Sequence, residues 1–367
     1  MGLPVRVFTA CKRSFHFESK KLSSWIQSPG VGGRALLWGG WTDLPDRKEL
    51  ESEWGTAFRS GALRHGEFLD CSREAGRWLQ IRPAPASTLF PAFFSPLGYE
   101  PKRQAQRKFS SDYRWPFPIV KHARVIRLLE ARGRITGFEY RHEISRKKIR
   151  VETNEVILCA SPFSTLSLLG GLSEPPPFLG QGISNHMVGG WIGVQPRSRK
   201  RLNPAYGFKR DRDGVFELKG PFPARELDPD WEEYEYYRIH FIGAMSTRRM
   251  KIRDFRVAGS WTWSARDRAR ARRIDRKLKQ ELRSLSQGIR CFRIQNPLDP
   301  SNIAHECGGA VLGKTVTPDG RVRNYENLFV MDASVMPTSL RTYPTLSLLS
   351  LIEGFLRKRG DKNAAFS

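Results

Sequence analysis

The last forty residues constrain the fold of this chain most strongly. A short apolar stretch, residues 328–331, ends at Asp332, small residues follow, and Pro344-Thr345 opens an apolar helix that is expected to run to residue 359. A buried strand that ends in an acidic residue, followed by a turn and a helix, is how α/β folds hold a ligand at the carboxyl end of a sheet. The sequence therefore predicts a ligand site beside Asp332.

A histidine lies in a glycine-rich stretch just before this strand. The stretch begins at His305, continues Glu-Cys-Gly-Gly-Ala-Val-Leu and ends at Gly313. An imidazole that titrates near neutral pH suits proton transfer, and the two glycines would leave room for a ligand and a substrate. A histidine that is simply hydrogen-bonded inside a core turn is the alternative. We interpret His305 as the candidate catalytic residue.

Together these stretches resemble the C-terminal signature of the glucose–methanol–choline (GMC) flavoprotein oxidoreductases. The likeness is to the cholesterol-oxidase branch, where His-x-x-Gly-Gly-x-x-Leu-Gly also precedes the strand. The resemblance implies an α/β fold plus an antiparallel sheet, that is, an FAD-binding domain with an inserted substrate domain. It also implies oxidation of a CH–OH group by hydride transfer to the flavin, with His305 as the general base. The family's second polar residue, which stands before a proline, corresponds to Tyr343, with Arg341 and Thr342 as nearby polar alternatives.

The resemblance further implies residues that contact FAD. The glycine-rich segment 30–40 resembles a family segment that packs against the flavin, although Ala35 stands where serine is common. Val125 corresponds to a contact with the adenine end, or is an ordinary sheet valine. Asp332 matches the aspartate near the ribityl and phosphate region, or is a simple helix N-cap. The expected cofactor-contacting residues are Gly32, Gly33, Trp38, Gly39, Gly40, Val125, Asp332, Ala333, Pro344 and Thr345.

The phosphate-binding loop expected of such a flavoprotein is not found. A Gly-x-Gly-x-x-Gly turn between a strand and a helix would cradle the pyrophosphate, yet Gly2 is the only glycine before Gly30. The resemblance therefore implies an FAD domain that lacks its N-terminal βαβ unit. Two alternatives stay open: an inactive truncated remnant that cannot hold FAD alone, and a basic nucleic-acid-binding protein.

Charge and cysteine content bear on partners and location. The net charge of +25 comes from 62 Lys and Arg against 37 Asp and Glu, spread along the whole chain, which makes nucleic-acid binding the less favoured reading. On the Arg-rich helix expected at 265–287, Asp267, Asp275 and Glu281 would supply counter-charges. The five cysteines form no Cys-x-x-Cys pair, so we expect no metal site and reduced thiols in a cytoplasmic protein. No apolar run reaches the ~18 residues of a membrane span.

The substrate is expected to be a small alcohol. Aromatic residues in the expected substrate domain favour an apolar substrate, but they would suit a core equally: Phe90, Phe93, Tyr236 and Trp263. The segment Ser184-Asn185-His186 resembles a family turn, and we interpret its histidine as structural. The oligomeric state cannot be read from the sequence.

Five segments describe the expected domain organisation. Residues 1–40 form an N-terminal segment with the glycine-rich loop, 41–118 and 190–299 form the substrate domain, and 119–189 and 300–367 form the FAD domain. Alternating and continuous apolar patterns predict strands at 123–129, 135–140, 148–153, 155–160, 214–218, 234–245 and 253–263. Helical spacing predicts helices at 47–62, 164–169, 265–287 and 345–359.

Overall fold

The computed structural model describes most of the chain beyond residue 41. The described residues are 42–45, 47–61, 63–79, 81–83, 98–101, 118–197, 205–244, 251–253, 256–258, 263–298 and 304–360. The glycine-rich segment with Gly32, Gly33, Trp38, Gly39 and Gly40 lies outside the described residues, as do Phe90 and Phe93. What we expect of these residues stays a prediction.

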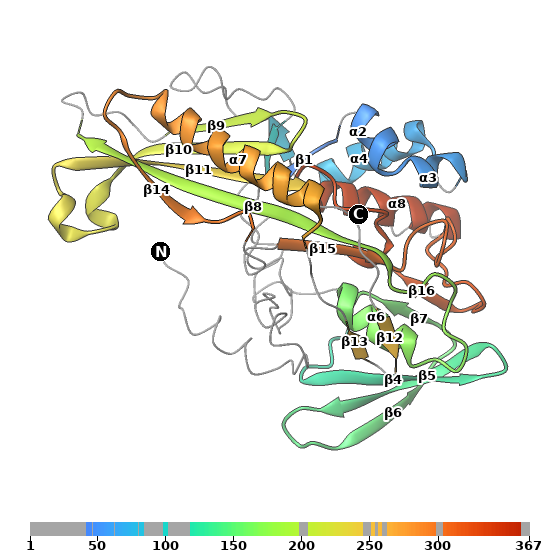
Figure 1. Cartoon of the computed structure of the whole chain (residues 1–367). Helices are drawn as coiled ribbons and strands as arrows, with labels where there is room; N and C mark the ends of the chain where they lie inside the picture. The colour runs from blue at the N-terminus through green and yellow to red at the C-terminus, as the bar shows by residue number, and fades with distance from the viewer. Residues whose placement is uncertain are drawn as a thin grey trace.

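A large antiparallel sheet forms one part of the molecule (Figure 1). Its strand order is β14-β8-β11-β10-β9, and β15 also pairs with β8. β8 is therefore central: β11 follows one of its edges, and β15 and then β14 follow the other. The strands are β8 Gln181–Pro196, β9 Ala205–Arg210, β10 Val215–Pro223, β11 Tyr234–Ala244, β14 Arg290–Gln295 and β15 Ala304–Gly309.

One face of this sheet is covered by α7, Ala265–Arg283 (Figure 1). The helix buries Ile274, Leu278 and Leu282 on a single stripe, as a spacing of four residues requires. Its first turn is closed by a capping box in which Ser264 and Asp267 bond to each other's backbone N–H.

The acidic residues of α7 do not serve as counter-charges along its outer face, so that expectation was wrong. Asp267 is used in the capping box. Asp275 accepts a hydrogen bond from Trp191 and pairs with Arg293, and Glu281 pairs with Lys209. All three carboxylates therefore serve the cap or neighbouring strands.

A smaller β-rich part contains the parallel pair β7 and β16, Val156–Leu158 and Leu328–Val330. An antiparallel meander of β4 Ala123–Ala131, β5 Arg134–His142 and β6 Lys148–Glu152 lies beside it (Figure 1). Asn327 joins the two: its side chain bonds the backbone N–H and carbonyl of Ile135 and the carbonyl of Asn154. α6, Pro162–Gly170, follows β7.

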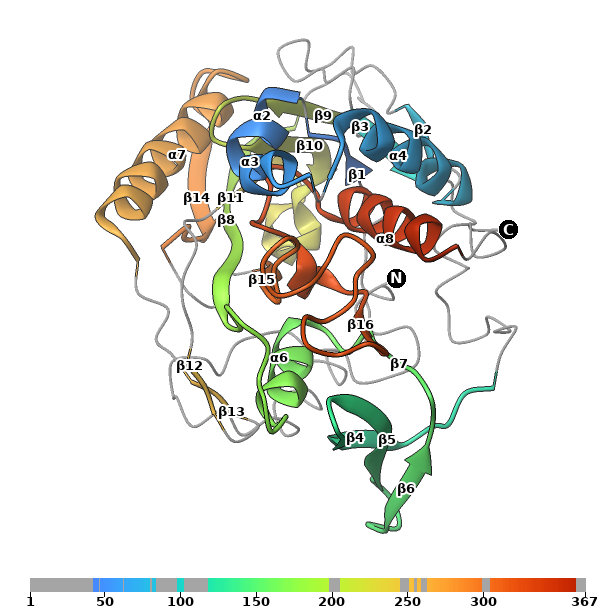
Figure 2. The same ribbon diagram turned by 90° about the vertical axis from the view of Figure 1, so that its right-hand side faces the viewer.

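Helices near the two ends of the described chain pack together. α4, His65–Leu79, lies along α8, Thr345–Arg359 (Figure 2). Gly360 in the left-handed conformation ends α8, as a C-terminal glycine does. The remaining elements are α2 Arg47–Glu53, α3 Gly55–Arg59, β1 Thr42–Asp43, β2 Ile81–Pro83, β3 Gly98–Pro101, β12 Lys251–Arg253, β13 Arg256–Ala258, and the 3-10 turns η3 Ala224–Glu226, η4 Pro229–Trp231 and η6 Ala333–Val335.

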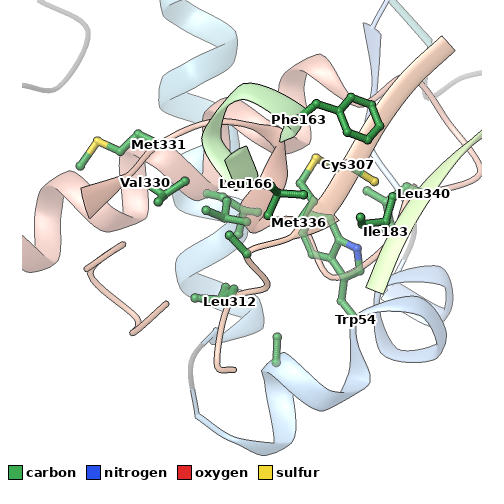
Figure 3. Close-up of a cluster of buried hydrophobic side chains, with 14 of the residues drawn as sticks. Trp54, Phe163, Leu166, Ile183, Cys307, Leu312, Val330, Met331, Met336 and Leu340 are labelled. Atoms are coloured by element: carbon green, nitrogen blue, oxygen red, sulfur yellow. The ribbon is translucent and has the colours of Figure 1, made fainter. Parts of the chain in front are cut away.

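The core lies where these parts meet (Figure 3). It gathers side chains from segments far apart in the sequence, and each of them is almost fully buried: Trp54, Phe163, Leu166, Ile183, Cys307, Leu312, Val330, Met331, Met336 and Leu340. The strand that carries His305 is therefore fixed against α6, β8 and the segment after β16.

The local predictions were mostly confirmed. The meander, the strand after residue 155, and the helices α6, α7 and α8 form where expected. The single strand expected over 253–263 was correct only in part: β13 lies within this range, but Arg253 belongs to β12, which pairs antiparallel with β13. The helix expected over 47–62 breaks at Trp54 into α2 and α3. α4, β8, β14 and β15 were not predicted.

The expected domain division stays a prediction, and β8 runs unbroken across its boundary at 189–190. Among the described helices, none has the length and apolar content needed to cross a bilayer.

Candidate active site

His305 lies in a bulge at the start of β15. Between Ala304 and Cys307 the strand advances three residues while β8 advances only from His186 to Ser184. The bulge places His305 at φ +67, a left-handed conformation that few residues other than glycine adopt readily. A bulge of this kind re-aims a side chain that a regular strand would direct elsewhere.

The re-aimed ring of His305 meets the ring of His186 on β8. Their Nδ1 atoms are 3.1 Å apart, and the ring planes cross at 82° with centroids 5.1 Å apart. The other nitrogen of His186, Nε2, lies 2.5 Å from the carbonyl oxygen of Leu340. His186 is fully buried, whereas His305 is half-buried. A continuous hydrogen-bonded chain thus runs from His305 to the backbone before α8.

Glycine is required at positions 308 and 309 for close packing of the backbone, and not to leave room for a ligand as the sequence predicted. Both have positive φ, +82 and +98. A Cβ on Gly308 would come within 2.1 Å of the Gly182 carbonyl oxygen, and one on Gly309 within 2.5 Å of Leu166. These glycines therefore let β15 pack against β8 and α6, rather than leaving space for a ligand.

Asp332 ends β16 and begins η6. Its carboxylate accepts a hydrogen bond from the backbone N–H of Ser334 at 2.9 Å and one from the Thr165 hydroxyl at 2.5 Å. Burial raises the pKa of Asp332, and the hydrogen bonds from Ser334, Thr165 and Ser161 only partly oppose this. The N-cap reading of Asp332 is correct. Because Ser334 N–H is taken by that carboxylate, it does not remain to hold a ligand oxygen.

The loop that leads into α8 is fastened on two sides. Trp54 donates from its indole N–H to the Thr338 carbonyl, and the Arg341 backbone N–H donates to the buried carboxylate of Glu49. On the other side Ser339 donates to the Asn185 carbonyl at 2.6 Å. This loop carries the Leu340 carbonyl and Tyr343, so its fixed position also fixes the acceptor of His186.

The start of α8 lies where the sequence placed it. Pro344 is the N-cap and Thr345 the first helical residue, with no side-chain cap and no acidic residue in the first turn. Tyr343 before it is half-buried, and its catalytic role stays a prediction. Ala333, in η6, is half-buried beside Asp332.

Val125 lies apart from this cluster, on β4 of the meander, where it faces Tyr140 and packs partly against the core. Its expected contact with a cofactor stays a prediction. Among the described residues no group of three potential metal ligands is brought together, and the four cysteines within them are free thiols.

A cavity elsewhere does not coincide with this site. It measures about 540 Å³ and is lined by polar and charged residues of α7 and its C-cap: Arg273, Arg276, Lys277, Gln280, Glu281 and Ser284. Three of these side chains already bond to residues beyond the helix: Arg273 to Asp213, Lys277 to Asp211 and Glu281 to Lys209. We therefore place the candidate site by chemistry, at His305.

The fold and site define a mixed α/β protein with antiparallel sheets, in which a histidine-bearing strand faces a strand–Asp–turn–helix unit. Residues 246–351 match the family model for GMC oxidoreductases, and the match includes His305, Asp332 and Tyr343. Over residues 246–351 the chain is similar to the GMC oxidoreductases.

A solved structure has a similar fold. The crystal structure of pyridoxine 4-oxidase from Mesorbium loti aligns with a TM-score of 0.54 over 80% of this chain and 70% of that chain, at 17% sequence identity. At this identity the likeness concerns the fold alone.

Sequence reasoning did not predict the contact between the two histidines. It interpreted His186 as structural, and His186 bonds directly to His305 across 119 positions of sequence. The local signal was a polar Ser-Asn-His run inside what proves to be a long, mostly buried strand. A buried polar side chain in a strand calls for a partner, and this rule could have singled the residue out.

Proposed function

We propose that this chain is an FAD-dependent oxidoreductase that oxidises a CH–OH group, with His305 as the general base. The match of residues 246–351 to GMC oxidoreductases supports the class of reaction. The observation that carries the proposal is the position of His305, in a strained bulge beside η6 and hydrogen-bonded to a second histidine. Strained residues that surroundings hold in place gather at active sites.

The start of α8 and the carboxylate of Asp332 support a place for the flavin end of FAD. α8 has a free N-cap position with no side-chain bond and no acid in its first turn. A helix N-terminus of this kind favours an electron-rich oxygen, such as a ring carbonyl of the flavin. Asp332, with its carboxylate at the carboxyl ends of β7 and β16, would bond a ribityl hydroxyl. Thr345 and Ala333 would contact the ring. The ADP end would depend on Val125 and on residues outside the described ones.

Bound FAD would supply the acceptor for the hydride that leaves the substrate carbon. The part of His305 is to accept the hydroxyl proton as the carbonyl forms, so that the alcohol loses one proton and one hydride. Tyr343, on the fastened loop, would orient the substrate oxygen by a hydrogen bond. The substrate would be a small alcohol.

The test uses the full chain and added FAD. We expect uptake of FAD, seen as quenching of flavin fluorescence, and bleaching of the bound flavin by an alcohol without oxygen. A panel of primary and secondary alcohols, from polar to apolar, would identify the substrate. His305→Asn should retain FAD and slow flavin reduction by about 10²- to 10⁴-fold, the usual worth of a general base.

His122→Asn is the matched control. His122 also has positive φ, +56, and is exposed at the turn before β4, so the same substitution is made in the same backbone conformation away from the site. We expect it to reduce flavin at the rate of the unaltered protein. A protein that takes up no FAD, or a His305→Asn variant that is as fast as the unaltered one, would refute the proposal. Failure to take up FAD would favour the inactive alternative.

A further inference from the structure

We propose that His186 is a positioning residue that holds His305 in a single tautomer, with the proton on Nδ1 and the lone pair on Nε2. The inference rests on the proposed role of His305 as a base, but it concerns a property of the protein that exists without FAD or substrate. It assigns to a buried sheet histidine the task of orienting and preparing its neighbour.

The tautomers follow from the direction of two hydrogen bonds. A backbone carbonyl can only accept, so Nε2 of His186 must carry the proton that lies between it and the Leu340 oxygen, 2.5 Å away. His186 has no exposed surface, and burial favours the neutral ring. A neutral ring with its proton on Nε2 presents a lone pair at Nδ1.

His305 must then donate to that lone pair. The 3.1 Å contact between the two Nδ1 atoms can be a hydrogen bond only if one carries a proton and the other does not. Because His186 Nδ1 is the acceptor, the proton belongs to His305 Nδ1. In the neutral ring of His305 the lone pair is therefore on Nε2, the nitrogen opposite the contact.

This arrangement prepares His305 to take a proton without rearrangement. When Nε2 of His305 gains a proton, its Nδ1–H continues to donate to His186, and His186 continues to donate to Leu340. The positive charge that forms on His305 is stabilised by a chain of aligned dipoles that ends at a carbonyl oxygen. Which nitrogen of a histidine is basic is set by the bond that the other nitrogen makes.

Neighbouring bonds keep the acceptor chain in place. The Ser339 hydroxyl donates to the Asn185 carbonyl and lies 2.7 Å from the Ser184 hydroxyl, so β8 and the Leu340 loop are joined directly before His186. The pairing of Ala304 with His186 fixes the register of β15 against β8, and with it the position of His305 beside His186. Ser184, Asn185, His186 and Ser339 are all fully buried. The two imidazole rings therefore have little room to rotate.

The first experiment reads the tautomers directly. Long-range proton–nitrogen correlation spectra of the FAD-free full chain, with ¹⁵N-labelled histidine, distinguish Nδ1–H from Nε2–H rings. The chain has seven histidines, and His186→Asn and His305→Asn assign the two signals by their loss. We expect His186 as the Nε2–H tautomer and His305 as the Nδ1–H tautomer at a pH where both are neutral. His305 as Nε2–H, or a doubly protonated His186, would overturn the inference.

The second experiment uses two substitutions of His186. His186→Leu removes the acceptor, and His305 should revert towards the Nε2–H form that free histidine side chains favour. In His186→Asn the amide oxygen occupies nearly the place of Nδ1, so it should keep His305 in the Nδ1–H form. If His186→Leu does not fold, the spectrum of the unaltered protein still decides the question. Identical His305 tautomers in the Leu variant and the unaltered protein would contradict the inference.

The loaded enzyme gives a separate readout. His186→Leu should lower kcat for flavin reduction by about 10²-fold or more with little change in KM, because a base in the wrong tautomer cannot accept the proton. His186→Asn should restore most of that loss. If the tautomers are as expected but FAD is not taken up, the proposed function fails and the positioning by His186 stands. If flavin is reduced at the normal rate but His305 is the Nε2–H tautomer, the proposed function stands and the positioning by His186 fails.

Discussion

His305 and Asp332 are both held in states that an isolated residue would avoid. The left-handed backbone of His305 costs on the order of 1 kcal/mol relative to glycine, and it persists because β15 is fixed by the surrounding core. Asp332 is a carboxyl group with almost no exposed surface and with neutral hydrogen-bond donors only in the contacts described above. Strained backbones and buried ionisable groups with perturbed pKa values are often found at functional sites.

The raised pKa of Asp332 predicts a pH-dependent penalty. A carboxyl group whose folded pKa lies above its unfolded pKa binds its proton more tightly in the folded state, so its favourable contribution is present at low pH and is lost as pH rises through the folded pKa. Asn caps a helix as well as Asp does. Asp332→Asn should therefore gain stability relative to the unaltered protein as pH rises from acidic to neutral.

Urea unfolding across a pH series measures this difference. Asp230→Asn, at an exposed carboxyl in η4, gives the baseline for the same chemical change on the surface. A difference between Asp332→Asn and the unaltered protein that stays constant with pH, or shrinks towards neutral pH, would contradict the prediction.

Between elements, polar side chains do much of the joining. The Asp213 carboxylate at the β9–β10 turn accepts two N–H hydrogen bonds from Arg273 of α7. Burial by itself would raise the pKa of Asp213. The positive charges of Arg273, Arg270 and Arg212 outweigh burial, so this pKa lies below its usual range. Asn327 likewise joins the meander to the parallel pair β7–β16. The carboxyl ends of β7 and β16 lie beside Asp332, so the Asn327 joint helps to position the candidate site.

Asn327→Leu should destabilise the fold by about 2–4 kcal/mol, because it leaves the Ile135 N–H and carbonyl and the Asn154 carbonyl without their partner in a buried place. Chemical unfolding followed by circular dichroism measures the loss. Asn154→Leu is the control: it makes the same change at an exposed neighbour and keeps the backbone carbonyl, so about 0.5 kcal/mol or less is expected. Equal effects of the two substitutions would show that the Asn327 joint is unimportant.

Over the whole molecule, the excess of positive charge acts against compactness. The chain has 62 Lys and Arg against 37 Asp and Glu, and several of the acids of the described residues are already used in pairs, such as Asp213, Glu281 and Glu353. Surface ion pairs contribute little each, about 0–1 kcal/mol. Repulsion among the unpaired Lys and Arg side chains is therefore expected to outweigh the attraction within the ion pairs. Salt screens both.

Added salt should then raise the melting temperature. Increasing sodium chloride from about 0.05 M to about 0.5 M shortens the screening length well below the dimensions of the molecule, and thermal unfolding should shift upwards by a few degrees. An uncharged osmolyte at the same osmolarity serves as the control for excluded-solute effects. A melting temperature that falls with salt would mean that native ion pairs dominate over the net charge.

The sequence by itself determined the elements whose signal is local. Alternation defined the meander, a four-residue apolar spacing defined α7, and the strand–Asp–turn–helix order defined β16, Asp332 and α8. It also placed His305 within a family signature. Each of these rests on neighbours within a few turns of the same segment, which is why they could be predicted.

Only the tertiary structure decided β8 and the partner of His305. β8 contains Gly189, Gly190 and Gly193, residues with weak strand preference, and it becomes a strand because β11 bonds one edge and β14 and β15 bond the other. Its His186 reaches His305 through a bulge and a register that no local pattern encodes. Contacts between distant segments depend on the packing of the whole core, so the sequence singled out His305 and only the fold brought His186 to it.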